Sequence, residues 1–463
     1  METYDIVIVG CGTAGQTAAY YLNEKGLKIA MVEQSDRPGG VCALAGCQAK
    51  KWLYEAAETI ARSRHLKGKG IAAAAEGNWK QVIDQKRQFT APIPESTIRG
   101  LEKSGIEYLK GSASFVNDDT LSVNGENISK KYVILATGAR PMPLPIEGMS
   151  HVVTSDEFLE LDALPQDIVF IGGGFISFEF AHFAARLGTA DQRSLILEVS
   201  KRPLGPFDPE MADLLVEASV AEGVDVQCDV QIEKIEKQDN RFFIRTAQGD
   251  GFETDLVVHG AGRIPDLESL CLDKTGVRYS ARGIAVDGFM RTASPRIFAI
   301  GDCAATIQLA RVADQEGLGA AETILADMER GQKIRMDYQA VPSVLFTYPQ
   351  LAMIGQTEAD LKQTGQTYLR SFAKNLRWPT YRRVGLKHAA YKLLTDADNR
   401  ILGAHILSDN ASGMINTIRQ AMLNQTPADM LYRQSIVSPY PTRESDLSYM
   451  LKPFTDGSCE RFN

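Results

Sequence analysis

The clearest pattern near the start of the chain is an apolar strand followed by glycines and a helix. Residues 4–33 read YDIVIVGCGTAGQTAAYYLNEKGLKIAMVE. The β-branched run from Ile6 to Val9 predicts a buried strand, and an amphipathic helix extends to Gly26. A second apolar run ends in Glu33. The pattern therefore predicts a βαβ unit.

Three glycines occupy the turn between this strand and the helix. Gly10, Gly12 and Gly15 have G-x-G-x-x-G spacing, and Glu33 closes the second strand. In a dinucleotide-binding unit, such glycines let the backbone approach a pyrophosphate at a helix N-terminus, and the acid binds a ribose hydroxyl. An ordinary turn also uses glycine, but the strand, helix and acid at these distances favour a nucleotide site.

The same pattern recurs at residues 167–198, DIVFIGGGFISFEFAHFAARLGTADQRSLILE. Gly172 and Gly174 take the first two glycine positions, Ser177 replaces the third, and Glu198 closes the second strand. Serine is small enough for helix-to-strand packing at that position. Two such units predict two bound dinucleotides, and therefore electron transfer between cofactors.

Two further apolar strands end in glycine. One strand, in YVILATGARPMPLPIEG, ends at Ala136, Thr137 and Gly138, and the other, in RIFAIGDCAA, ends at Gly301 and Asp302. Each strand follows a dinucleotide unit, which favours a cofactor contact over a simple turn.

Length and composition restrict the class of protein. A chain of 463 residues suggests about three domains, and 44% hydrophobic with 23% charged residues is typical of a globular protein. The net charge of −8 argues against a nucleic-acid partner. We expect no membrane span, because no apolar run approaches ~18 residues. The N-terminal residues lack a basic region and a cleavage site, so we expect a cytoplasmic protein.

Seven scattered cysteines are typical of a reducing compartment, and without C-x-x-C pairs or histidine clusters we expect no metal site. Only Cys42 and Cys47 are close in sequence. At C-x4-C spacing they lie about 140° apart on an ideal helix, so bonding them requires a distorted turn. Gly39, Gly40 and Gly46 supply the necessary flexibility. The two residues are either a redox couple or independent small core residues, and the flanking cofactor motifs favour the couple.

With these motifs the chain resembles the class I pyridine nucleotide-disulfide oxidoreductases, which include dihydrolipoyl dehydrogenase, glutathione reductase and mercuric reductase. Seven motifs occur in family order, nearly end to end. They are the two glycine turns, C-x4-C, ATGARP, GAGRIPD (260–266), FAIGD, and VPSVLFTYPQLAMIGQTEADL (341–361).

The resemblance implies an α/β protein with two Rossmann-like dinucleotide-binding domains and a C-terminal α+β interface domain that forms a homodimer. The FAD-binding domain would comprise residues 1–150 and 271–338, the NAD(P)-binding domain 151–270, and the interface domain 339–463. In the last domain, YKLLTDADNRILGAHIL predicts a hairpin that turns at Asp-Ala-Asp-Asn.

The resemblance also implies roles for individual residues. Gly10, Gly12, Gly15 and Glu33 would hold the adenosine half of FAD, and Asp302 its ribitol. The other expected contacts to cofactors are Gly40, Ala136, Thr137, Gly138, Gly262, Gly301, Gly172, Gly174, Ser177 and Glu198. Glu198 favours NAD over NADP, because a carboxylate repels a 2′-phosphate, although Lys201 and Arg202 follow it.

The expected catalytic residues are the cysteine pair and charged groups near the flavin. Lys50 or Lys51 would form an ion pair with Glu179 close to the flavin N5 atom. Electrons would pass from NAD(P)H to FAD and then to the Cys47 side. Cys42 would then meet a small disulfide, dithiol or thiol-reactive acceptor.

The sequence departs from the family in two places. Around the cysteines, Val41, Leu44 and Ala49 stand where the family usually has Thr, Asn and Pro. At the C-terminal signature His-Pro-Thr-x-x-Glu, Tyr440 replaces the histidine and Ser445 its carboxylate partner. An imidazole exchanges protons near neutral pH, whereas a phenol is a donor and a poor base.

Because Tyr440 replaces the family histidine, two alternatives to a dihydrolipoyl dehydrogenase-like activity stay open. Mercuric reductases have Tyr at this position and add a C-terminal cysteine pair, of which this chain offers only Cys459. One alternative is therefore a metal reductase. The other is a flavoprotein that senses or relays redox state to a protein partner.

Overall fold

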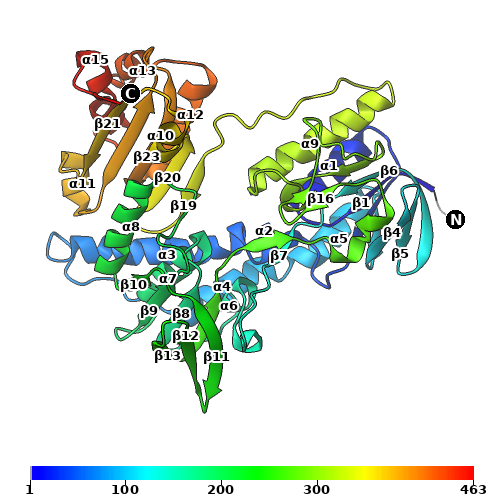
Figure 1. Cartoon of the computed structure of the whole chain (residues 1–463), viewed down its shortest axis with the longest axis horizontal. Coiled ribbons are helices and arrows are strands. Elements are labelled where there is room, and N and C mark those ends of the chain that lie inside the picture. Colours follow the sequence, from blue (N-terminus) through cyan, green and yellow to red (C-terminus); the bar gives the residue numbers. More distant parts are fainter. Residues whose placement is uncertain (1–2, 463) are drawn as a thin grey trace. The chain divides into compact units, whose positions relative to one another are not determined.

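The computed structural model describes residues 3–462, which form two compact units (Figure 1). Unit 1 contains residues 3–52, Gln81–Pro143 and Gly262–Asp337. Unit 2 contains Leu53–Lys80, Leu144–Ala261 and residues 338–462. Each unit is therefore assembled from three separate pieces of the chain.

A mostly parallel sheet forms the centre of unit 1. Its strand order is β3-β2-β1-β6-β5-β4, with β18 also paired to β6. The strands β3, β2, β1, β6 and β18 are parallel, and their apolar residues, such as Ile6 and Ile134, are fully buried. The bounds are β1 Thr3–Val9, β2 Ile29–Glu33, β3 Glu107–Lys110, β4 Ala113–Asn117, β5 Thr120–Val123, β6 Glu126–Leu135 and β18 Ile297–Ala299.

Two long helices of unit 1, α1 (Thr13–Glu24) and α9 (Ala310–Asp327), pack against each other (Figure 1). Their contact is close, because a Cβ atom on Gly317 would lie 2.8 Å from the Ala14 carbonyl oxygen. The smaller elements are α2 Gly40–Leu44, α5 Ile93–Lys103, β7 Ala139–Pro141, β15 Arg263–Pro265, β16 Tyr279–Ser280, β17 Gly283–Ile284, η2 Glu268–Leu270, η3 Leu272–Lys274 and η4 Gly301–Cys303. Helices α3 (Cys47–Leu66) and α4 (Trp79–Thr90) contribute residues to both units.

One part of unit 2 repeats the parallel βαβ arrangement. A four-stranded parallel sheet has the order β10-β9-β8-β14, and a three-stranded antiparallel sheet has the order β11-β12-β13. The bounds are η1 Met149–His151, α6 Ser155–Phe158, β8 Asp167–Ile171, α7 Phe175–Leu187, β9 Arg193–Leu197, α8 Pro209–Ala221, β10 Val224–Gln227, β11 Ile232–Gln238, β12 Arg241–Thr246, β13 Gly251–Thr254 and β14 Leu256–His259.

The other part of unit 2 is a six-stranded antiparallel sheet with helices. Its order is β19-β20-β23-β22-β21-β24. The predicted hairpin is confirmed, because β22 pairs with β23 around a turn at residues 396–400. The bounds are β19 Ser343–Leu345, β20 Gln350–Gly355, α10 Glu358–Thr364, β21 Tyr368–Lys374, α11 Pro379–Val384, β22 Ala390–Thr395, β23 Ile401–Ser408, α12 Ala411–Leu423, α13 Ala428–Ser435, η5 Glu444–Asp446, α14 Leu447–Leu451, α15 Pro453–Asp456 and β24 Glu460–Phe462.

A buried cluster of charges connects these two parts of unit 2. The Lys392 ammonium lies 2.8 Å from a carboxylate oxygen of Asp208 and 2.8 Å from one of Glu358. All three side chains are almost completely buried. Asp208 caps the start of α8, whereas Lys392 is on β22 and Glu358 begins α10. The paired charges therefore replace the water that each group would otherwise require.

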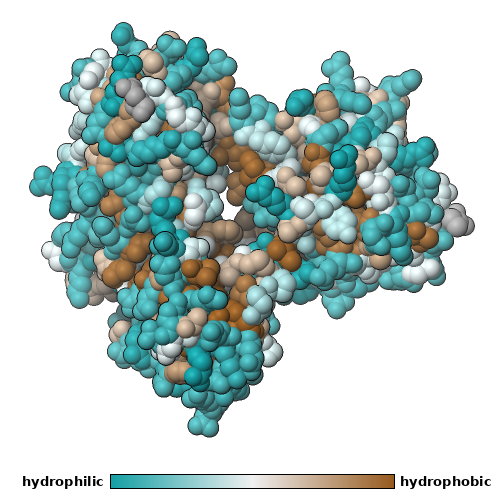
Figure 2. All heavy atoms as spheres, in the orientation of Figure 1, coloured by the Kyte–Doolittle hydropathy of each residue, from teal (hydrophilic) through white to brown (hydrophobic). Residues whose placement is uncertain are grey.

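The predicted fold class is confirmed, because the structure contains two βαβ units and an α+β region near the C-terminus. The division at residues 150, 270 and 338 stays a prediction. No helix among residues 3–462 is long and apolar enough to cross a membrane. On the face shown in Figure 2, most side chains are hydrophilic.

Candidate active site

The first glycine turn leaves its backbone open at the middle position. A Cβ atom on Gly10 would lie 2.2 Å from the Ala136 carbonyl oxygen, and one on Gly15 would lie 2.1 Å from the Gly10 oxygen. At Gly12, by contrast, a Cβ atom would have a neighbour only at 3.9 Å, the Cα atom of Gly40. The outer glycines thus allow close packing, and the middle one presents backbone to open space, as pyrophosphate binding requires.

Glu33 holds this turn in place. One carboxylate oxygen accepts the Cys11 N–H at 2.9 Å, and the other accepts the Ser35 N–H at 2.8 Å. Cys11 is fully buried, and burial together with the Glu33 charge raises the pKa of its thiol to about 12. The cysteine within the glycine turn is therefore unreactive, and the acid is oriented before any ribose binds.

The ATG motif lies in unit 1 together with Gly262, the last residue of the GAG motif, whereas Gly260 and Ala261 belong to unit 2. Strands β7 and β15 pair antiparallel, and the Asp266 N–H donates to the Gly138 carbonyl at 3.0 Å. Gly138 and Gly262 both have positive φ angles, and a Cβ atom on either would meet nothing within 4 Å. Ala136, Thr137, Gly138 and Gly262 are thus gathered beside the first glycine turn, with open space next to two of them.

Gly301 and Asp302 lie in η4, which follows strand β18. The Gly301 N–H donates at 2.6 Å to Glu316, a fully buried residue of α9. Asp302 is half-buried; burial raises its pKa, and the positive charge of Arg263 opposes that effect. Sequence reasoning did not identify Glu316, because nothing local indicates that it holds a glycine turn 15 residues away.

The second glycine turn, in unit 2, repeats the first with one substitution. A Cβ atom on Gly172 would lie 2.4 Å from the Ala261 Cα atom, whereas one on Gly174 would have its nearest neighbour at 3.5 Å. Ser177 is accommodated because Gly260 faces it, and a Cβ atom on Gly260 would lie 1.9 Å from the Ser177 hydroxyl oxygen. The third position therefore tolerates serine only because its neighbour is glycine.

Glu198 makes the same two contacts as Glu33. Its carboxylate accepts the Gly173 N–H at 2.5 Å and the Ser200 N–H at 2.7 Å. Both turns are thus braced by an acid at the end of the second strand. The arrangement fits two dinucleotides, one in each unit.

The cysteine pair occupies a break between two helices. Helix α2 ends at Leu44 and α3 begins at Cys47, and a Cβ atom on Gly46 would lie 2.7 Å from the Val41 carbonyl oxygen. Cys42 is half-buried and Cys47 is exposed. The pKa of Cys42 is raised by its hydrogen bond with Cys47, then by burial and the nearby charges of Cys47 and Asp314, while Arg311 lowers it. The two sulfur atoms are therefore neighbours.

The remaining predicted catalytic residues lie in different units. Lys50 and Lys51 follow Cys47 on α3 within unit 1, and both are half-buried. Glu179 is on α7 in unit 2, where it is 1% exposed and accepts the Phe346 N–H at 2.9 Å. Tyr440, also in unit 2, is 72% exposed. The expected lysine–glutamate pair stays a prediction.

The structure also reveals charged residues at the start of α1 and α9 that sequence reasoning missed. Arg311, near the start of α9, pairs with Asp314 at 2.9 Å, and Asp314 accepts hydrogen bonds from the hydroxyls of Thr13 and Thr17 on α1. Asp314 lies 301 positions from Thr13 in the chain, so no local sequence pattern indicated this contact.

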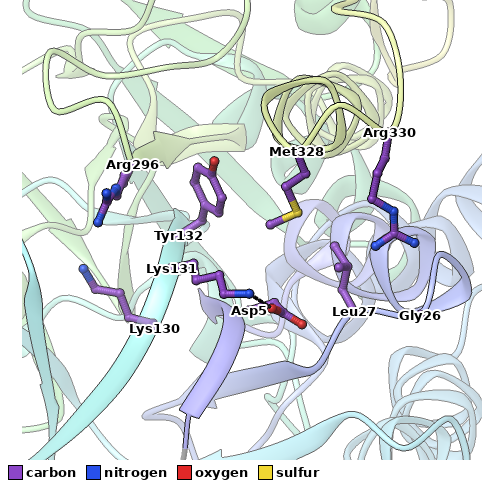
Figure 3. Close-up of a pocket in the computed structure, with 9 residues that line it drawn as sticks. All are labelled: Asp5, Gly26, Leu27, Lys130, Lys131, Tyr132, Arg296, Met328 and Arg330. Carbon is purple, nitrogen blue, oxygen red and sulfur yellow. Dashed lines mark hydrogen bonds and ion pairs between the residues drawn. The ribbon is translucent and has the colours of Figure 1, made fainter.

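A separate pocket of about 520 Å³ lies in unit 1, away from the carboxyl ends of the sheet's parallel strands (Figure 3). It is lined by Asp5, Gly26, Leu27, Lys130, Lys131, Tyr132, Arg296, Met328 and Arg330. These residues lie near the N-terminal ends of β1 and β18, in the middle of β6, and just beyond the C-terminal ends of α1 and α9, and Lys131 pairs with Asp5 at 2.7 Å. The glycine turns follow the carboxyl ends of the strands, where nucleotides bind in such sheets. The pocket is therefore distinct from the cofactor site.

Comparison with known proteins decides the family. Residues 4–317 match the model for pyridine nucleotide-disulphide oxidoreductases, and residues 341–448 match the dimerisation domain of the same proteins. The chain belongs to this oxidoreductase family. Members of the family are FAD-dependent and use NAD(P)H, and the open glycine turns of this oxidoreductase fit both nucleotides.

Individual relatives of the oxidoreductase differ in their acceptors. Mercuric reductase of Staphylococcus aureus is 32% identical over 89% of this chain and 76% of its own length. Dihydrolipoyl dehydrogenase of Chlamydia trachomatis is 31% identical over 95% of this chain and 94% of its own. A Cu(II) complex of the HOCl-induced flavoprotein disulfide reductase RclA from Escherichia coli superposes with a TM-score of 0.86, at 26% identity over 98% of this chain and 99% of that one.

Proposed function

We propose that this oxidoreductase transfers two electrons from NADH, through FAD, to a small disulfide by way of Cys42 and Cys47, and that it acts as a homodimer. The observation that carries the proposal is the pair of adjacent thiols at the α2–α3 break. Helix α2 begins at Gly40, whose backbone packs on Gly12 of the first glycine turn. The thiols therefore sit beside the expected flavin site.

The chain's own residues carry out thiol–disulfide exchange. The Cys42 thiolate attacks one sulfur of the acceptor, which forms a mixed disulfide and releases the first thiolate. The Cys47 thiolate then attacks the Cys42 sulfur, which releases the second thiolate and leaves a Cys42–Cys47 disulfide. When bound, FAD supplies two-electron transfer between the nicotinamide and this disulfide. Overall, NADH, one proton and the disulfide become NAD⁺ and two thiols.

A reductive titration tests the cysteine couple. Because both the flavin and the disulfide accept electron pairs, full reduction should consume more than one hydride equivalent per flavin. A Cys47→Ser variant should need only one. If that variant and the wild type have equal stoichiometry, the two cysteines are not a redox couple.

The proposed preference for NADH is supported by Glu198. Its carboxylate is fixed by two backbone amides at the turn, where it would accept a ribose 2′-hydroxyl and repel a 2′-phosphate. We expect kcat/KM for NADH to exceed that for NADPH by about 10-fold or more, since unfavourable charge placement costs at least ~1.4 kcal/mol. A clear preference for NADPH would contradict the assignment, and would indicate that Lys201 or Arg202 binds the phosphate.

A second candidate function is reduction of a thiol-reactive metal ion. It is supported by Tyr440 in place of the family histidine and by the mercuric reductase relative. NADH and Hg²⁺ would give NAD⁺, H⁺ and Hg⁰, whereas two Cu²⁺ ions would each accept one electron. Steady-state assays with lipoamide, glutathione disulfide, Hg(II) and Cu(II) separate the two functions. No turnover with any of these acceptors would favour a redox relay to a protein partner.

A further inference from the structure

Arg311 is a cation at a position where helix stability favours an anion. It is the second residue of α9, and its side chain is 94% exposed. Each helix has a partial positive charge at its N-terminus, so a basic residue in the first turn is unfavourable for helix stability. Its ion pair with Asp314 is a surface pair of small net value. Stability alone therefore does not account for the arginine.

Arg311 nevertheless has a defined ion-pair partner. One Asp314 oxygen lies 2.9 Å from the guanidinium, and the other accepts from Thr13 and Thr17 on the neighbouring helix. Asp314 thus ties the arginine to α1. A guanidinium has five N–H donors in a planar fork, and at this exposure most of them face solvent.

The same contacts place Arg311 in the part of unit 1 that contains α2, the helix of Cys42. A Cβ atom on Gly40, the first residue of α2, would lie 2.5 Å from the Gly12 Cα atom, so α2 rests on the start of α1. Cys42 is two residues further along α2, and Thr13 follows Gly12. Asp314 raises the pKa of Cys42 and Arg311 lowers it, as expected for charges on the same side of unit 1 as this thiol.

We infer that Arg311 is a specificity-determining residue that binds the carboxylate of an anionic disulfide or dithiol reacting at Cys42. A guanidinium and a carboxylate form two parallel charge-assisted hydrogen bonds. The inference rests on the thiol couple of the proposed function and names its substrate class.

Two alkylating reagents of similar size test the inference on the reduced holoenzyme without turnover. Iodoacetate carries a carboxylate and iodoacetamide does not, and each forms an S–C bond at Cys42 and releases iodide. We expect Arg311→Gln to lower the ratio of the iodoacetate rate to the iodoacetamide rate at Cys42 by about 10-fold, because the charge-assisted hydrogen bonds to the carboxylate are lost. Peptide mapping by mass spectrometry assigns each rate to Cys42.

Arg99→Gln is the matched control. Arg99 is also an exposed arginine of unit 1, on α5, and pairs with Glu95 within its own helix at 3.5 Å. This variant should leave the ratio unchanged. An unchanged ratio in Arg311→Gln would overturn the inference, and so would equal slowing by both reagents, because the arginine would then only tune the thiol.

Lipoate and lipoamide extend the test to turnover. They share one dithiolane ring and differ in the charge of the tail. Arg311→Gln should lower kcat/KM for lipoate about 10-fold, mainly through KM, and leave lipoamide within about 2-fold. An equal loss with both would overturn the inference. A further outcome is that the wild type reduces neither compound while Arg311→Gln still lowers the alkylation ratio. That result would contradict the proposed disulfide acceptor but would support carboxylate binding by Arg311.

Discussion

Tyr440 is the residue at which this chain differs most clearly in chemistry from the disulfide reductases it resembles. It is 72% exposed, and Thr442 and Ser445, which follow it, hydrogen-bond to each other. In the proposed homodimer the tyrosine would reach the partner's cysteine pair. A phenol there can donate a proton to a leaving thiolate but is a poor base at neutral pH.

We predict that Tyr440→Phe lowers the rate of acceptor reduction about 10- to 100-fold, since the loss removes one proton donor. Reduction of the flavin by NADH should be unchanged when measured by stopped-flow absorbance. Tyr449→Phe is the control, because Tyr449 is another exposed tyrosine of this region and contacts Trp378. A Tyr440→Phe variant that matches the wild type on its acceptor would show that the tyrosine only packs.

Because Tyr440 stands where the family has a histidine, we also predict a pH dependence for the oxidation of dihydrolipoamide, which is the reverse of disulfide reduction. Without a neutral base, dihydrolipoamide must ionise unaided, near the ordinary thiol pKa of about 8.5. Oxidation of dihydrolipoamide should therefore be slow at pH 7 and rise several-fold toward pH 9. A pH–rate profile with a plateau below neutral pH would indicate another base.

Sequence patterns identify candidate site residues, whose roles stay predictions, but not how distant residues support them. The acids Glu33 and Glu198 follow from strand and glycine spacing, and in the structure each accepts a backbone N–H of its glycine turn, while their binding of a ribose stays a prediction. Asp314 contacts Thr13 across 301 positions of the chain, and no local pattern encodes such a contact. Arg311 was missed for that reason.

At the scale of elements, the βαβ units and the hairpin were predictable because each is encoded within about 30 residues. The pairing of β7 with β15 was not, since it joins residues 139–141 to 263–265 and depends on how the chain returns to unit 1. The break between α2 and α3 was expected as a distorted turn, because two thiols at C-x4-C spacing cannot meet on one regular helix.

The second glycine turn gives a prediction at this scale. Gly172 has a φ angle of +92°, and a Cβ atom would lie 2.4 Å from the Ala261 backbone. Gly172→Ala should therefore raise the KM for NADH about 10-fold or more, while FAD content, measured by absorbance, stays at one per chain. Gly205→Ala is the control in unit 2, because its Cβ would meet nothing within 4 Å. An unaltered KM in Gly172→Ala would show that the turn does not bind the nicotinamide nucleotide.

At the scale of the whole molecule, the cluster of Lys392, Asp208 and Glu358 makes stability depend on pH. Burial acts to raise the pKa of Glu358, but hydrogen bonds from Lys392, Tyr368 and Lys362 outweigh it and lower the pKa to about 2. Because the folded-state pKa is lower than the unfolded one, the ionised carboxylate stabilises the fold above about pH 4.5, and this contribution is lost as the pH falls toward 2.

We predict that Glu358→Gln lowers the free energy of unfolding by about 3 kcal/mol at pH 7, at ~1.4 kcal/mol per pKa unit. The difference from the wild type should shrink as the pH falls from 4.5 toward 2. Thermal unfolding of the holoenzyme across this range measures it. Glu253→Gln, at an exposed pair with Arg241, should cost less than ~1 kcal/mol at any pH. A constant difference between wild type and Glu358→Gln would contradict the proposed charge effect.

The brace at Glu198 has a consequence for how coenzyme preference could drift in evolution. The carboxylate proposed to read the ribose is also the acceptor for the Gly173 and Ser200 amides. Replacing this acid by a neutral or basic side chain would allow a 2′-phosphate to bind. The same replacement would remove the hydrogen bonds that hold the Gly173 and Ser200 amides. The phosphate would then have to take over both amides, so the apo form of such an intermediate would be less ordered than either ancestor or descendant. A change at Glu198 would therefore alter both the coenzyme preference and the order of the loop that contains Ser200.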